Sequence, residues 1–149
     1  MVNPQSGPGF QLQSPVQFMR TRIVMTSSAV FLGLIGLFLS FMPHEVLAFY
    51  SVSTSEPIPL LLQLGGGGLV GWAMVNWTAR GLLIGGIYSR PLTLGNLIHF
   101  VAVTLALAKA MPGLDFQPLT AALLFGYGLF AACFGYLVFW NGAACIRSG

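Results

Sequence analysis

Charged side chains are nearly missing from this sequence. Asp, Glu, Lys and Arg together make up 6% of the 149 residues, whereas 56% are hydrophobic. In an ordinary soluble domain about a quarter of the residues are charged. A chain of this length cannot bury so much apolar surface in water, so the composition excludes a soluble globular domain and indicates a membrane protein.

Residues that carry chemistry at enzyme and metal sites are also scarce. The chain has three acidic residues, two histidines and two cysteines, and its net charge is +3. Cys133 and Cys145 would lie roughly 18 Å apart along one helix, too far for a disulfide. There is no CxxC pair or Cys/His cluster, so we expect neither a metal site nor an enzyme. The basic residues stand singly near the ends of apolar runs, which argues against nucleic-acid binding.

Four apolar runs are each long enough to cross a bilayer, because a helix rising about 1.5 Å per residue needs about 20 apolar residues to span the hydrocarbon. They cover residues 23–42, 59–78, 91–109 and 119–140. The sequence therefore predicts an all-α fold, a polytopic integral membrane protein with four transmembrane helices in an up-down bundle. These helices form one domain over residues 23–149. Residues 1–22 are expected to form a flexible arm, since most of this segment is rich in Pro, Gln, Ser and Gly.

Two connections between these runs have features of their own. After the first run, Pro43 and Glu45 suit the first turn of a short helix, where proline loses no hydrogen bond and a carboxylate meets the positive end of the dipole. Between the second and third runs, residues 81–89 are apolar but too few to cross the membrane again. The second and third runs therefore form a transmembrane hairpin.

The basic residues predict the orientation in the membrane, because cytoplasmic loops are enriched in Lys and Arg. With a cytoplasmic amino terminus, five of the six basic residues lie inside, namely Arg20, Arg22, Arg80, Arg90 and Arg147. Glu45, Glu56, Asp115 and Lys109 then lie outside. We expect both termini in the cytoplasm and a bacterial inner membrane as the location.

Four polar residues of the hairpin are candidates for a site. Asn76 and Arg80 are spaced four apart, and Asn96 and His99 three apart, so each pair shares a helix face. Polar groups in a spanning helix turn toward the bundle, so the four can converge there. The cluster is either a hydrogen-bonded pin between helices or a functional site. The functional options are a proton relay, a quinone pocket or an axial ligand for haem or chlorophyll, with Asn96 and His99 binding the cofactor; the sequence specifies none.

Small residues at helical spacing predict faces where helices approach closely in lipid. The residues selected on this basis are Gly33, Gly36, Gly67, Gly71, Gly128, Ala132 and Gly135. The four consecutive glycines Gly65–Gly68 do not form a phosphate-binding loop, because no Gly-Lys-Ser/Thr follows them. They either pack against a neighbouring backbone or break the second helix so that free carbonyls line a cavity.

The block NWTARGLLIGGIYSRPLTLGNLIHF, Asn76 to Phe100, resembles segments of small uncharacterised bacterial four-helix membrane proteins. The resemblance supports the helix count and implies no activity.

Three functions agree with these features. The first is a non-catalytic accessory subunit of a larger membrane complex, packed against other membrane subunits through small-residue faces. The second is a small transporter or an ion or proton pathway, which would use a break at Gly65–Gly68 together with Asn96 and His99. The third is a subunit that binds quinone, haem or chlorophyll through His99. We expect the bilayer lipid, in every case, to be the main surrounding partner.

Overall fold

The computed structural model describes residues 15–52, 57–81, 89–113 and 117–146, and every regular element in these ranges is a helix. The elements are α1 (Pro15–Phe41), α2 (Pro43–Phe49), α3 (Ile58–Ala79), α4 (Ser89–Ala110), the 3₁₀ turn η1 (Met111–Gly113) and α5 (Pro118–Ile146). The four long helices each contain a segment long and apolar enough to cross a membrane: Met19–Phe41, Ile58–Ala79, Arg90–Ala110 and Pro118–Phe139. The predicted all-α fold with four spanning helices is confirmed.

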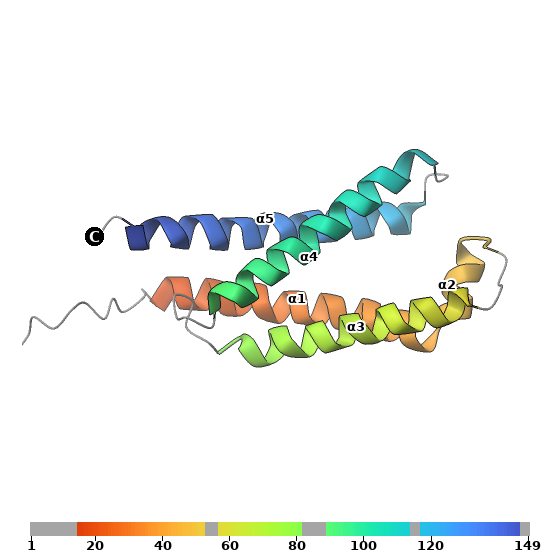
Figure 1. Ribbon diagram of the computed structural model, residues 1–149, viewed down its shortest axis with the longest axis horizontal. Coiled ribbons are helices and arrows are strands. Elements are labelled where there is room, and N and C mark those ends of the chain that lie inside the picture. Colours follow the sequence, from red (N-terminus) through yellow and green to blue (C-terminus); the bar gives the residue numbers. More distant parts are fainter. Residues whose placement is uncertain (1–14, 53–56, 82–88, 114–116, 147–149) are drawn as a thin grey trace, which may run out of the picture.

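The four long helices alternate in direction, as an up-down bundle requires (Figure 1). Helix α1 packs along α3, and α4 packs along α5. Helix α4 runs obliquely, starting beside the α1/α3 pair and ending beside the start of α5 (Figure 1). The first half of α4 therefore meets α3, and the second half leaves it.

Helix boundaries differ from the prediction mainly at the two ends of the chain. Helix α1 begins at Pro15 rather than at residue 23, and α5 continues to Ile146 rather than ending at 140. Residues 15–22, assigned to the arm, are thus helical, and a proline at the start of a helix loses no intrahelical hydrogen bond. The rest of the predicted arm, 1–14, lies outside the described residues.

The short helix predicted after the first run is present as α2. Its N-cap is Met42, Pro43 occupies its first turn, and Glu45 is the acidic residue there. Met42 has φ −128° and ψ 46°, because the residue before a proline is disfavoured in the α region, and this ends α1. The hydroxyl groups of Tyr50, just after α2, and Thr120 on α5 lie 2.9 Å apart and share a hydrogen bond.

The contact between α1 and α3 depends on two glycines that face each other. A Cβ atom at Gly36 would lie 2.8 Å from the carbonyl oxygen of Gly66, and a Cβ atom at Gly66 would lie 2.7 Å from the backbone nitrogen of Ser40. Real Cβ atoms do not approach backbone so closely, so both positions require glycine. One turn earlier, Gly33 faces the Cβ of Ala73 at 3.6 Å. The two helices pack backbone against backbone, which close approach in lipid favours.

An aromatic cluster joins α1, α4 and α5. Phe100 of α4 is fully buried, and its ring stacks on Phe134 and Phe130 of α5 with centroids 5.4 Å and 5.1 Å apart. Phe31 of α1 meets Tyr127 edge to face at 5.2 Å. By contrast, large apolar side chains on the outer surface remain open, with Phe125 and Phe139 each 74% exposed. An outer surface of this kind suits lipid and would be unfavourable in water.

Candidate polar site between the helices

Two asparagine side chains form a reciprocal pair between α3 and α4. Asn76 and Asn96 are both fully buried. The Nδ2 of Asn76 donates to the Oδ1 of Asn96 at 2.8 Å, and the Nδ2 of Asn96 donates to the Oδ1 of Asn76 at 2.8 Å. Each amide therefore supplies both the donor and the acceptor that the other one needs.

Three further hydrogen bonds complete the network. Asn76 Nδ2 also donates to the Oγ of Ser28 on α1 at 3.2 Å, and Asn96 Nδ2 donates to the carbonyl oxygen of Leu92 at 3.0 Å. The indole Nε1 of Trp72 donates to Asn96 Oδ1 at 3.0 Å. All four amide hydrogens are in use, and three helices are joined. A buried polar network that is fully paired stabilises one arrangement of the helices.

His99 lies beside this pair without bonding to it. Its ring is 6.0 Å from that of Trp72, 5.3 Å from that of Phe100 and 6.0 Å from that of Tyr127, measured between centroids. Its Nε2 atom is buried and has no hydrogen-bond partner among the described residues. Binding of a cofactor through His99 and Asn96 stays a prediction.

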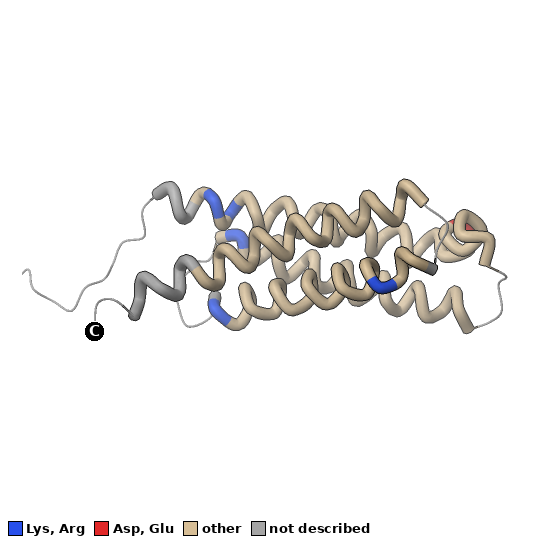
Figure 2. Tube along the Cα trace, turned by 90° about the horizontal axis from the view of Figure 1, so that it is seen from above, with Lys and Arg blue, Asp and Glu red and all other residues tan. Residues whose placement is uncertain are grey.

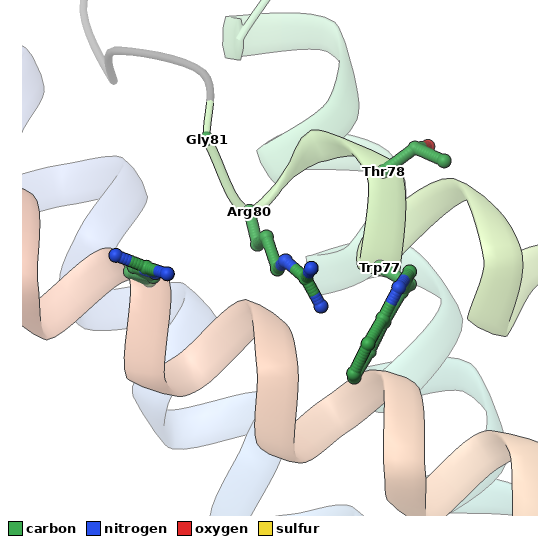
Figure 3. Close-up of a pocket in the computed structure, with 5 residues that line it drawn as sticks. Trp77, Thr78, Arg80 and Gly81 are labelled. Carbon is green, nitrogen blue, oxygen red and sulfur yellow. The ribbon is translucent and has the colours of Figure 1, made fainter.

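Arg80 does not join the polar cluster. Its guanidinium lies 3.8 Å from the centroid of the Trp77 ring, in a cation–π contact at the end of α3. Figure 3 shows Arg80 and Trp77 facing each other at the edge of a pocket, while Thr78 points away. Of the four residues expected to converge, Asn76, Asn96 and His99 lie together. Arg80 lies apart from them, at the carboxyl end of α3.

Two residues of the hydrogen-bond network, Trp72 and Ser28, were not predicted from the sequence. Trp72 lies four residues before Asn76, so a search for any N–H donor on that helix face would have found it. Ser28 carries no such signal, because the contact between α1 and α3 places it there. The asparagines themselves are recognisable because a polar side chain in a spanning helix is expensive unless paired.

The selected small residues divide into two groups. Gly33 and Gly36 face α3, while Gly128 and Gly135 on α5 face Thr104 and Leu97 of α4, each with an added Cβ 3.8 Å from the neighbouring side chain. Gly67, Gly71 and Ala132 are exposed in the described part of the chain. A Cβ at Gly67 or Gly71 would meet no atom within 4 Å. Within α3 it is Gly66 that faces α1, and packing of these three residues against a helix outside this chain stays a prediction.

Helix α3 also runs without interruption through Gly65–Gly68. The break on which the transport alternative depends is therefore absent, and no backbone carbonyl is released there to bind an ion.

Together these features define a polytopic α-helical membrane protein, with a lipid-facing apolar exterior and a paired polar network inside. Among the described residues, no three His, Cys, Asp or Glu side chains are grouped so as to hold a metal ion. Comparison of the chain with protein-family models, with curated proteins and with solved structures finds no match.

Proposed function

We propose that the chain is a non-catalytic accessory subunit of a larger membrane complex, and that it contacts its partner through one face of α3. This face, the glycine stripe, consists of Gln63, Gly67 and Gly71, which follow one another at intervals of four residues. All three are exposed. The open stripe is the single observation that carries the proposal.

Two properties make the stripe suitable for a partner helix. Glycines four apart form a smooth groove in which a second backbone can approach closely, and both glycines have free space above them. Gln63 adds an exposed amide that has no hydrogen-bond partner in the described part of the chain. An amide facing lipid is unfavourable, and a partner helix with a polar side chain or a carbonyl can pair with it.

The inner polar network supports a structural role. Its amide groups already bond to one another, so they are not free to bind a substrate. The network holds α1, α3 and α4 in one arrangement and so presents the glycine stripe on a rigid helix.

We also propose that the protein lies in a bacterial inner membrane with both termini in the cytoplasm. Figure 2 shows the described arginines gathered at one end of the bundle, with the described acidic residue, Glu45, at the other. Arg20 and Arg22 belong to the start of α1, Arg80 follows α3, and Arg90 belongs to the start of α4. The positive-inside rule assigns this end to the cytoplasm.

The test compares two valine variants after gentle extraction from the native membrane. Gly67→Val fills the stripe, whereas Gly65→Val adds the same side chain to α3 on a different face. A Cβ at either position would have no atom of another described residue within 4 Å. We expect wild-type protein and Gly65→Val to migrate on a native gel with other protein chains, and Gly67→Val to migrate alone.

Two results would contradict the proposal. One is a wild-type protein that migrates as a stable monomer or as an assembly of this chain alone. The other is an equal effect of the two valine variants, since the partner would then not recognise the stripe.

A further inference from the structure

A pocket at the arginine-rich end of the bundle has a composition suited to an anion. Its volume is about 380 Å³, and it is lined by Arg22 of α1 together with Trp77, Thr78, Arg80 and Gly81 at the end of α3 (Figure 3). Ligand pockets commonly have volumes of about 300–1,000 Å³. Two of the five lining residues are arginines and none is acidic. Two cations lining one pocket repel each other, and a bound anion removes this repulsion.

The charges of these arginines are not neutralised within the described part of the chain. Glu45 is the one acidic residue in the described ranges, and it lies in α2, at the opposite end of the bundle (Figures 1 and 2). At a membrane surface the local dielectric is lower than in water, so unpaired guanidinium groups attract an anion more strongly there.

Of the side chains that line the pocket, the two arginines are the ones placed to bind an anion. The Trp77 ring holds the Arg80 guanidinium at 3.8 Å, which limits its freedom before any ligand arrives. A guanidinium stacked on a ring still has N–H donors at its edge. These donors lie in one plane and can form two parallel hydrogen bonds to the oxygens of a phosphate. The Thr78 hydroxyl donates to the carbonyl oxygens of Met74 and Val75 and points away from the pocket.

Arg22 also lines a second, larger depression on the outer face of α1. Its volume is about 660 Å³, and its other lining residues are mostly apolar, including Ile23, Val30, Leu34 and Phe130. A cationic pocket and an apolar surface thus meet at one side chain. An inorganic anion would use only the first, whereas a phospholipid, which has a charged head and an apolar chain, would use both.

We infer that Arg22 and Arg80 bind the phosphate of an anionic phospholipid, whose acyl chain lies along the outer face of α1. The lipid is held at the arginine-rich surface of the bilayer and contacts α1 and α3 together. This site shares no residue with the glycine stripe.

The experiment measures which lipid remains on the full chain. The protein is placed in nanodiscs made of equal parts phosphatidylglycerol and phosphatidylcholine, and the lipids retained after release are identified by native mass spectrometry. We expect the wild type to retain phosphatidylglycerol preferentially. Arg22→Gln with Arg80→Gln should lower this preference by roughly fivefold for each arginine, the usual contribution of one basic residue near an anionic surface.

A second double variant separates a site from general surface charge. Arg20→Gln with Arg90→Gln removes the same charge from the same end of the bundle, but neither residue lines the pocket. We expect this variant to keep the wild-type preference. Equal losses in both double variants, or no preference in the wild type, would overturn the inference.

Inorganic phosphate distinguishes a lipid site from a site for a free anion. Added as a competitor, it should leave phosphatidylglycerol bound, because it cannot use the apolar face of α1. Displacement of the lipid by inorganic phosphate would overturn the lipid assignment. Gly67→Val is expected to keep the lipid preference, so loss of the partner and loss of the lipid are separately observable.

Discussion

At the scale of single residues, the most informative feature is that two buried amides pair with each other. In the interior of a bilayer no water is present to replace a lost hydrogen bond, so one amide alone would be unfavourable. The pair Asn76 and Asn96 is satisfied because each supplies what the other lacks, and Ser28, Leu92 and Trp72 take up the remaining bonds.

The amide pair leads to a prediction about coupling. Asn96→Leu leaves the amide of Asn76 and the indole N–H of Trp72 without their partner, and we expect it to lower the free energy of unfolding by about 1–3 kcal/mol. Asn76→Leu should have a similar effect. The double variant should cost less than the sum of the two, because no unpaired amide then remains.

A double-mutant cycle on unfolding in detergent measures this coupling. We expect an interaction energy of about 0.6 kcal/mol, the mean for polar contacts between membrane helices, and at most about 1.7 kcal/mol. Strict additivity of the two substitutions would show that the side chains do not depend on each other.

At the scale of elements, α3 has different roles on its different faces. Gly66 meets the backbone of α1, Trp72 and Asn76 meet α4, and the glycine stripe is open. Asn76 marks the face toward the bundle, but α3's own sequence does not separate the face that meets α1 from the open one, because the helix is apolar nearly all round and its hydrophobic pattern indicates no preferred direction. The presence of the helix and the inward direction of Asn76 were predictable, whereas the choice of Gly66 as the residue that meets α1 was not.

The rotation of α3 predicts opposite effects for two neighbouring glycines. Gly66→Ala places a Cβ 2.7 Å from the backbone of α1, and we expect a loss of about 1–3 kcal/mol as the helices are forced apart. Gly68→Ala places a Cβ where no atom lies within 4 Å, and should stabilise the protein by up to about 1 kcal/mol, since alanine favours the helix.

Thermal unfolding of the two alanine variants in the same detergent checks this difference. If Gly66→Ala were as stable as Gly68→Ala, α1 and α3 would not pack backbone against backbone as described.

At the scale of the whole molecule, the distribution of charge gives the bundle two different ends. The arginine-rich end holds the anionic-lipid pocket, and the other end carries α2 and its Glu45 (Figure 2). Because the helices alternate in direction, an even number of spans returns the chain to the side where it started. The amino and carboxyl termini therefore lie on the same side of the membrane.

The orientation is tested by fusing a reporter to the carboxyl terminus. Green fluorescent protein should fluoresce there, because it folds in the cytoplasm, and alkaline phosphatase fused at the same position should be inactive. Active phosphatase would place this end outside and would remove the basis for the predicted cytoplasmic termini.

The sequence by itself determined the four spanning helices, because the length of each apolar run matches the thickness of a bilayer and a helix satisfies its own backbone hydrogen bonds in lipid. It also singled out Asn76, Asn96 and His99 as polar residues of the bundle. The tertiary structure decided the rest: that the asparagines pair with each other and also bond to Trp72 and Ser28, that Arg80 stacks on Trp77, and that Gly66 rather than Gly67 faces α1. These contacts depend on helix rotation and crossing angle, which arise from packing between helices and leave no period in a uniformly apolar sequence.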